Sequence, residues 1–285
     1  MPLTAMAGNR PPATRIAVTS GKGGVGKTSL TVNLGVAMAR LGHRVGILDA
    51  DFALGNIDVA LGLAPEAHLG AVLDGQKSVS DIMLEGPSGV RVIPAGSGVR
   101  SLTTLDDEKW KRLTAAVDEA GRDLDFLLFD TATGIGDNVL DVVGLADYIM
   151  VVTSFEPAAV VDAYAVIKLI SANDARTPIG VVVNTARDAE EGHLVFRQIS
   201  LAAQRFLNRT LRYDGHVLED RSVKDSSLAQ VPLVGGESAS PASRDIRRLA
   251  SRLTASRPSG AGPWPARPTL VTPRALAAME APRCA

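Results

Sequence analysis

Short apolar runs separated by segments with a helical pattern extend over most of the chain. The clearest of these runs do not alternate polar and apolar positions, which is typical of strands that helices cover on both faces. The segment after the first run repeats apolar residues with the helical period, at Leu30, Leu34, Ala37 and Leu41. The predicted strands are Ile16–Thr19, Val45–Leu48, Val90–Ile93, Phe126–Phe129, Tyr148–Val152, Ile179–Val183 and Gly215–Val217. Because strands and helices alternate, we expect an α/β fold: a single doubly wound, mostly parallel sheet with helices on both faces.

The last predicted helix has a clear beginning. Ser240 is a typical N-cap residue and Pro241 suits the first helical position. The helix should bury its apolar residues Ile246, Leu249, Ala250 and Leu253. Six of the sixteen prolines fall in residues 258–285, which are too poor in apolar residues to form a core. We therefore expect one domain over residues 14–257, a disordered segment over 1–13 and a disordered tail over 258–285.

Composition and charge narrow the classes of function. Hydrophobic residues make up 46% of the chain, and the formal net charge of −1 gives no general attraction to nucleic acid. The one cysteine, Cys284, excludes a disulfide or a cysteine-ligated metal cluster within the chain. The first residues lack the apolar core of a signal peptide, and no segment approaches the roughly 18 apolar residues that span a bilayer. A cytoplasmic location is expected.

A glycine-rich loop follows the first predicted strand and opens a helix, with the pattern Gly21-x₄-Gly26-Lys27-Thr28. This is the setting in which successive backbone N–H groups and a helix N-terminus bind phosphate. Lys27 should reach the β- and γ-phosphates, and the Thr28 hydroxyl should be a ligand of Mg²⁺. The predicted nucleotide-binding residues of this loop are Gly21, Lys22, Gly23, Gly24, Val25, Gly26, Lys27, Thr28 and Ser29.

A second lysine in this loop carries a resemblance to a known family. The segment from Lys22 to Thr28 resembles the deviant Walker A loop of the MinD/ParA ATPases, which are P-loop NTPases. In that family the early lysine contacts phosphates bound by the other subunit. The resemblance implies that the chain binds ATP with Mg²⁺, dimerises with ATP, and uses Lys22 in trans and Lys27 in cis for hydrolysis.

Polar residues at the ends of other predicted strands belong to the same expected site. Asp49 and Asp51 follow the second strand, and Asp130 follows the run Phe126–Phe129. Carboxylates at the carboxyl ends of strands face the ligand crevice in this architecture. The resemblance implies that Asp51 positions the attacking water, while Asp49 and Asp130, with Thr28, serve the Mg²⁺. It also implies that Asn184, after the strand Ile179–Val183, contacts adenine, although an asparagine there also suits a turn.

Three segments are similar to one branch of the family, the flagellar-number regulators FleN and FlhG. They are Asp49 to Leu63, Val92 to Gly98, and Glu156-Pro157 with Asp162 to Lys168. The resemblance implies control of flagellar number or placement, with the GTPase FlhF and a FleQ-type transcription activator as partners. Residues Met1–Thr14 lack the Asp-Gln-Ala-x-x-Leu-Arg segment with which some members stimulate FlhF, and the tail lacks an amphipathic stripe. Peripheral attachment to the inner face of the membrane stays open.

Other functions within the family remain as alternatives. A ParA-like partition ATPase would bind DNA, and a MinD-like division-site regulator would bind membranes. Four arginines lie on the last predicted helix (Arg244, Arg247, Arg248 and Arg252), but in a near-neutral chain a solvated helix face explains them better than DNA binding. An iron-protein reductase or cluster scaffold shares the loop but needs more cysteines. A binding module without catalysis is disfavoured by the presence of Asp51.

Overall fold

The computed structural model describes residues 11–96, 105–174, 176–236 and 239–255. In these residues one eight-stranded sheet has the order β3-β4-β2-β5-β1-β6-β7-β8. All neighbouring strands are parallel except β3 and β4. The strands are β1 (Thr14–Thr19), β2 (Val45–Ala50), β3 (Leu84–Glu85), β4 (Arg91–Ile93), β5 (Phe126–Thr131), β6 (Tyr148–Thr153), β7 (Ile179–Ala186) and β8 (Arg212–Leu218).

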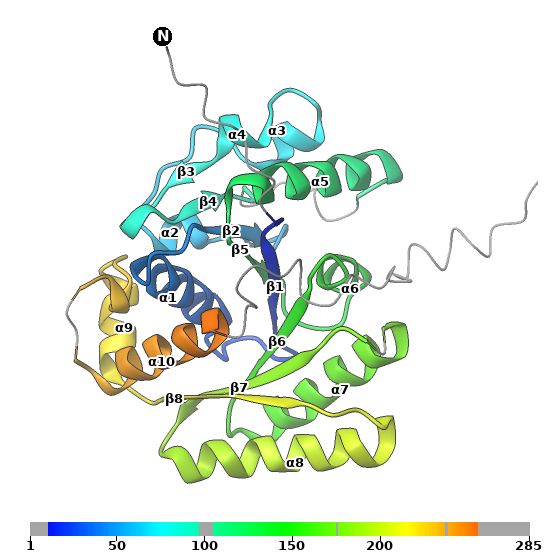
Figure 1. Ribbon diagram of the computed structural model, residues 1–285, viewed down its shortest axis with the longest axis vertical. Coiled ribbons are helices and arrows are strands. Elements are labelled where there is room, and N and C mark those ends of the chain that lie inside the picture. The colour runs from blue at the N-terminus through cyan, green and yellow to red at the C-terminus, as the bar shows by residue number, and fades with distance from the viewer. Residues whose placement is uncertain (1–10, 97–104, 175, 237–238, 256–285) are drawn as a thin grey trace, which may run out of the picture.

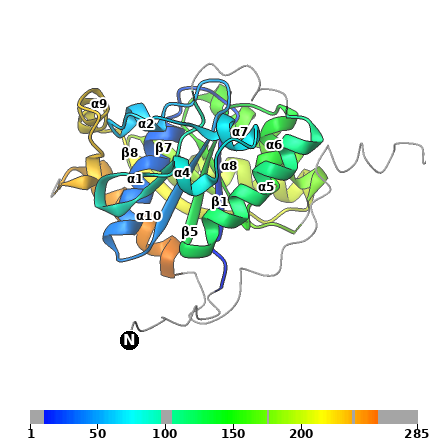
Figure 2. The same ribbon diagram turned by 90° about the horizontal axis from the view of Figure 1, so that it is seen from above.

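Helices cover both faces of this sheet. Figure 1 shows α1, α9 and α10 on one side of the strands and α6, α7 and α8 on the other, and Figure 2 shows the molecule from above. The helices are α1 (Lys27–Arg40), α2 (Ile57–Ala60), α3 (Leu69–Leu73), α4 (Val79–Ile82), α5 (Asp107–Ala120), α6 (Asp137–Val143), α7 (Pro157–Asn173), α8 (Ala189–Leu207), α9 (Arg221–Leu228) and α10 (Pro241–Ala255). Short 3₁₀ turns are η1 (Pro87–Gly89), η3 (Gly121–Asp123) and η4 (Leu233–Gly235). Within the described ranges, no helix has the length and apolar character that a membrane span requires.

Each central strand contributes to two separate cores. Along β5, Phe126 and Leu128 pack in the cluster that contains α1 and α10. Their neighbours Leu127 and Phe129 pack in the cluster that contains α5, α7 and α8. Successive side chains of a strand point to opposite faces, so a strand between two helical layers must be apolar at every position. This explains the continuous apolar runs and confirms the predicted doubly wound α/β fold.

The seven predicted strands are all present, with small differences at their ends. β3 was not predicted, because a two-residue antiparallel edge strand has no hydrophobic pattern of its own. Helix α10 begins at Pro241 as expected, with the Ser243 N–H 3.3 Å from the Ser240 hydroxyl, and its four predicted apolar residues are buried. Leu41 was wrongly placed on the buried face of the first helix. It follows the end of α1 and is 50% exposed.

The predicted disordered segments fall almost entirely outside the described residues. Only residues 11–13 of the N-terminal segment are described, and Ala13 is buried, with its N–H bonded to Gly121 O. The tail over 258–285 lies wholly outside them. The domain boundaries therefore remain predictions.

A buried polar network joins β6 to the edge strand β8. The Tyr148 hydroxyl lies 2.7 Å from both carboxylate oxygens of Asp214, and Arg212 Nε lies 3.0 Å from one of them. Asp214 is the extra residue of a bulge, because β7 pairs Val181 with Tyr213 and Val182 with Gly215. The network passes over Gly180 of β7, where a Cβ atom would lie 2.0 Å from both Asp214 and Tyr148. Glycine at position 180 is therefore a steric requirement.

We expect the stability contributed by Asp214 to depend on pH. Burial raises the pKa of Asp214 to about 6, against the opposing effects of the Tyr148 hydrogen bond and of Arg212 and Arg252. The folded state therefore binds this proton more tightly than the unfolded state, whose pKa is near 3.8. The contribution of the Asp214 carboxyl to the free energy of unfolding is fully present below about pH 4 and is lost as the pH rises through about 6.

The test compares the wild type with Asp214→Asn by denaturant unfolding at several pH values. The free energy of unfolding of the wild type, relative to the variant, should fall by roughly 2–3 kcal/mol between pH 4 and pH 7. A relative stability that stays constant or grows over this range would contradict the raised pKa.

Candidate nucleotide-binding site

The predicted site residues gather at one edge of the sheet, where the parallel strands end. Asp49 of β2 pairs in register with Asp130 of β5, and Val18 of β1 lies on the other side of Asp130. The glycine-rich loop leaves β1 after Thr19 and enters α1 at Lys27. Three neighbouring strands thus bring Asp130 close to residues that are more than 80 positions away in the chain. In open α/β sheets, ligands typically bind in a crevice at the carboxyl ends of the strands.

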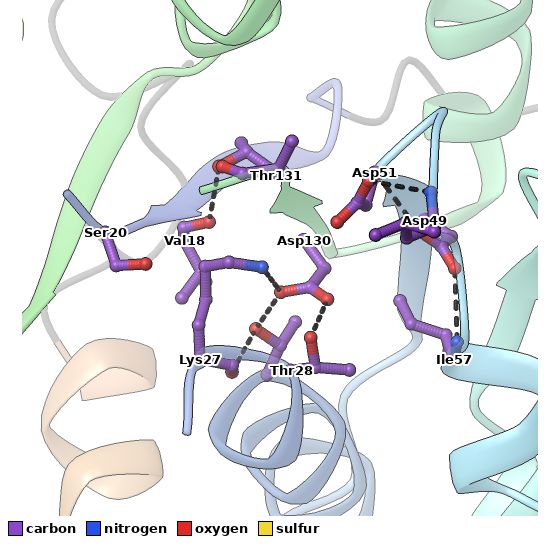
Figure 3. A network of polar contacts seen from close by, with 12 residues as sticks. Val18, Ser20, Lys27, Thr28, Asp49, Asp51, Ile57, Asp130 and Thr131 are labelled. Atoms are coloured by element: carbon purple, nitrogen blue, oxygen red, sulfur yellow. Dashed lines mark hydrogen bonds and ion pairs between the residues drawn. The ribbon is translucent and has the colours of Figure 1, made fainter. Parts of the chain in front are cut away.

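A buried ion pair stands at the centre of the site. Lys27 Nζ lies 2.8 Å from Asp130 Oδ1, and the two side chains are 5% and 1% exposed. The Thr28 hydroxyl donates to Asp130 Oδ2 at 2.6 Å, and Thr31 Oγ1 lies 3.0 Å from Asp130 Oδ1. Figure 3 shows the Asp130 carboxylate between Lys27 and Thr28. The hydrogen bonds and the ion pair compensate the cost of burying both charges.

The glycine-rich loop has the backbone geometry of an anion-binding site. Gly26 is the N-cap of α1 in a left-handed conformation, with φ of 83°, and no side chain caps the first N–H groups of the helix. These N–H groups and the helix dipole therefore remain available at the N-terminus. The preceding Val25 is 6% exposed, so the loop is anchored on the core. The arrangement suits a phosphate group.

Asp49 fixes the loop that carries Asp51. Its two carboxylate oxygens accept hydrogen bonds from the N–H groups of Asp51 and Ile57, both at 3.1 Å (Figure 3). Burial raises the pKa of Asp49 to about 7, and the nearby charge of Asp130 adds to this, while the two N–H groups oppose it. Asp51 Oδ1 in turn accepts from Leu54 N–H at 3.0 Å. The Asp49 carboxylate thus connects the first residue of this loop to the start of α2.

Two other predicted residues flank the glycine-rich loop. Lys22 forms an ion pair with Glu156, at the N-cap of α7, and the lysine side chain is 35% exposed. Asn184 of β7 donates its side-chain amide to Val25 O at 2.7 Å. The structure thus places Asn184 against the loop itself. Its predicted contact with adenine remains a prediction, as does the action of Lys22 on a second subunit.

Sequence reasoning missed two residues of this site. Thr31 follows Lys27 by four positions and Thr28 by three, so the helical period places all three on one face. That spacing would have identified Thr31 as a neighbour of Asp130. Glu156 stands in a segment already noted for its resemblance to other proteins, but no pattern in the sequence indicates that it pairs with Lys22.

The donor atoms around Asp130 fit a magnesium ion that a nucleotide shares. Thr28 and Asp130 offer oxygen atoms only, which hard cations such as Mg²⁺ prefer. Within the described part of the chain, no group of three or more histidine, cysteine or acidic residues is arranged to hold a metal by itself. Mg²⁺ usually keeps several waters and binds through one or two protein oxygens together with substrate phosphates. The residues present fit such a shared site.

Comparisons with known proteins agree with this geometry. A family model described as ParA, NUBPL iron-transfer P-loop NTPase, matches residues 13–254. The chain is 39% identical over 246 residues to the antiactivator FleN of Pseudomonas aeruginosa, covering 86% of this chain and 88% of FleN. It is 32% identical over 216 residues to the flagellum site-determining protein YlxH of Helicobacter pylori, covering 75% and 70%. The MinD cell division protein of Aquifex aeolicus has a TM-score of 0.68 at 30% identity, covering 85% of this chain and 97% of that chain.

The chain belongs to the ParA family of P-loop NTPases. The predicted resemblance to the MinD/ParA proteins, and to FleN in particular, is confirmed. The iron transfer in that description is a property of the family model, and this sequence has one cysteine, Cys284.

We expect the effects of substitutions at Lys27 and Asp130 on the free energy of unfolding to be strongly non-additive. Asp130→Asn leaves the buried Lys27 ammonium without a counter-charge and should lower the free energy of unfolding by about 3 kcal/mol. Lys27→Met in the Asp130→Asn background should recover most of that loss, because no buried charge then remains. Denaturant unfolding of both single variants and the double variant measures this coupling.

The exposed pair Arg221–Asp225 of α9 is a control, with side chains that are 90% and 61% exposed. Asp225→Asn should change stability by less than about 0.5 kcal/mol. Additive effects of Lys27→Met and Asp130→Asn would show that the two charges do not stabilise each other.

Proposed function

We propose that this protein is an ATP-dependent molecular switch that binds ATP with Mg²⁺, dimerises in the ATP-bound state and hydrolyses ATP slowly. One observation carries the proposal: a phosphate loop with two lysines, Lys22 and Lys27, beside the paired carboxylates Asp49 and Asp130. Lys27 lies buried at the start of α1, whereas Lys22 is partly exposed and faces outward to Glu156. One lysine is thus positioned for a nucleotide in its own subunit, and the other is accessible to a second copy.

Each residue has a defined part in this mechanism. The N–H groups of residues 21–29 bind the phosphates, and Lys27 neutralises charge on the β- and γ-phosphates. Asp51, held by the loop that Asp49 organises, orients the attacking water. Lys22 reaches the phosphates of the partner subunit and supplies positive charge during transfer. Positioning and charge neutralisation are what phosphoryl transfer chiefly requires from a protein.

Magnesium is the metal that this proposal requires. Thr28 and Asp130 would hold it, with Asp49 close to its water shell. When bound, it would neutralise developing charge on the phosphates. The ammonium of Lys27 keeps the Asp130 carboxylate oriented toward the Thr28 hydroxyl.

The biological role that we propose is control of flagellar number or placement from the cytoplasm. Its support is the similarity to FleN and YlxH, whose names refer to an antiactivator and to flagellum site determination. The partners we propose are a second copy of the chain, the GTPase FlhF and a FleQ-type transcription activator. Peripheral membrane attachment is a separate question, which binding to liposomes with ADP and with ATP would answer.

Direct DNA binding is not part of the proposal. The four arginines of α10 all contact acceptors within the chain. Three of them donate to backbone carbonyl groups: Arg244 to Ala239, Arg247 to Gly236 and Arg252 to Asp214. The fourth, Arg248, forms an ion pair with Asp245. These contacts support a structural function for the basic face. ATP-dependent binding of duplex DNA at low salt would instead favour a partition ATPase.

Lys22→Ala tests the action in trans. The variant should bind a mononucleotide with nearly wild-type affinity, because Lys27 and the loop N–H groups are intact. It should dimerise poorly with ATP and lose most of the hydrolysis rate. Light scattering and phosphate release measure these two properties. Normal dimerisation together with a wild-type hydrolysis rate would contradict the proposed function of Lys22.

Asp51→Ala tests the switch itself. The variant should accumulate an ATP-bound dimer, because nucleotide binding persists while water is no longer oriented. Size-exclusion chromatography should show a monomer with ADP and a dimer with ATP, with hydrolysis reduced by about a hundredfold or more. Wild-type turnover in this variant would remove Asp51 from the mechanism, and a monomer in ATP would remove the dimer switch.

A further inference from the structure

A hydrogen bond connects Asn184, which is expected to contact the adenine base, to the loop that is expected to bind the phosphates. The Asn184 side chain, at the end of β7, donates to Val25 O inside the phosphate loop at 2.7 Å. Gly26 makes this approach possible, because a Cβ atom there would lie 2.4 Å from the Asn184 amide nitrogen. Asn184 is only partly buried, but its partner Val25 is 6% exposed. The contact therefore braces the loop from the side of the sheet.

The planar peptide group gives this contact a consequence for phosphate binding. Val25 O and the Gly26 N–H belong to one trans peptide unit, so they point in opposite directions. A hydrogen bond that holds Val25 O toward Asn184 therefore turns the Gly26 N–H away from Asn184. The direction of one of the loop's donor groups thus depends on a side chain 158 positions away in the chain.

The backbone around Asn184 is held in an uncommon conformation. Thr185 has φ of 55°, a left-handed conformation that β-branched residues rarely adopt. The pairing of β7 with β8 shifts register between Val183 and Ala186, so Asn184 lies in an irregular part of the strand. Strained backbone of this kind persists where the surrounding structure enforces it, commonly at functional sites.

The loop after β7 is also fixed from its other end. The backbone N–H of Arg187 donates to Glu191 at 2.8 Å and its Nε at 2.6 Å. The Arg187 guanidinium lies 4.9 Å from the centre of the Phe155 ring. Phe155 directly precedes Glu156, the partner of Lys22. The segment that follows Asn184 is therefore held at Arg187 by α8 and by Phe155, which suits Asn184 to hold the phosphate loop in place.

The geometry points to Asn184 as a positioning residue for the phosphate loop: its amide, held on Val25 O, orients the Gly26 N–H toward the phosphates. This function is separate from any contact with the base, so binding of phosphate without a base also depends on Asn184. The inference rests on the proposed nucleotide binding and deepens it, since it couples the base side of the site to the phosphate side.

Inorganic tripolyphosphate, which has no base, separates the two functions of Asn184. Asn184→Leu keeps the size and neutrality of the side chain but removes the donor. Binding of Mg²⁺–tripolyphosphate and of Mg²⁺–ATP to the full chain is measured by competition against a fluorescent nucleotide. Loss of one hydrogen bond should weaken tripolyphosphate binding by about tenfold. ATP binding should weaken by at least as much.

Asn173→Leu is the matched control. Asn173 is a half-buried asparagine at the end of α7 whose amide donates to Leu169 O at 3.1 Å, outside the site. This variant should bind both ligands as the wild type does. Hydrogen exchange without any ligand adds a second measurement. Asn184→Leu should speed exchange over residues 21–28 several-fold, and Asn173→Leu should not.

The outcomes distinguish failure of this inference from failure of the proposed function. Weaker ATP binding with unchanged tripolyphosphate binding would show that Asn184 acts on the base alone and would overturn the inference. Unchanged exchange over residues 21–28 would do the same. A wild-type protein that binds neither ligand would overturn the proposed function and the inference with it.

Discussion

The ion pair between Lys27 and Asp130 determines how the site is organised. Each side chain is almost fully buried, and neither charge is tolerable there without the other. The pair fixes the start of α1 against β5, and the Thr28 hydroxyl donates to the second oxygen of the carboxylate. An anion that binds Lys27 competes with Asp130 for the same ammonium, unless a cation takes its place at the carboxylate. The proposed binding of phosphate by Lys27 and of Mg²⁺ by Asp130 would therefore be coupled.

Around this pair, the loops at the ends of four strands hold one another. Asp49, near the end of β2, accepts hydrogen bonds from both ends of the following loop, which carries Asp51, and Asn184, within β7, contacts the loop after β1. Lys22 in turn reaches Glu156 after β6. Each of these contacts joins a side chain to a backbone group or to an opposite charge. These contacts link the phosphate loop to its neighbours, a connection that the proposed nucleotide-dependent switch would use.

The fold and the site support different parts of the functional conclusion. The doubly wound sheet is shared with MinD and other members of the family, and a common fold does not by itself define a function. The phosphate loop, its two lysines and the three aspartates support nucleotide chemistry. The proposed flagellar role depends on similarity to FleN and YlxH, because no feature of the site identifies the regulated partner.

The sequence by itself determined the α/β architecture, a sheet between two layers of helices, and predicted most of the residues that the structure brings together at the candidate site. Strands buried on both faces must be apolar throughout, and a glycine-rich loop between a strand and a helix is typical of phosphate binding. Both features can therefore be predicted from residues that are close together in the sequence. The short strand β3 and the end of α1 near Leu41 were missed because edge pairing and helix termination depend on neighbours in space.

Tertiary structure alone decided which side chains meet. Lys27 with Asp130, Lys22 with Glu156 and Asn184 with Val25 O are each separated by more than 100 residues. Their contacts follow from the strand order, which places β5 and β6 on either side of β1 and β7 next to β6. No local periodicity encodes that order. The sequence therefore supplied the chemical groups, and the packing of the sheet determined their partners.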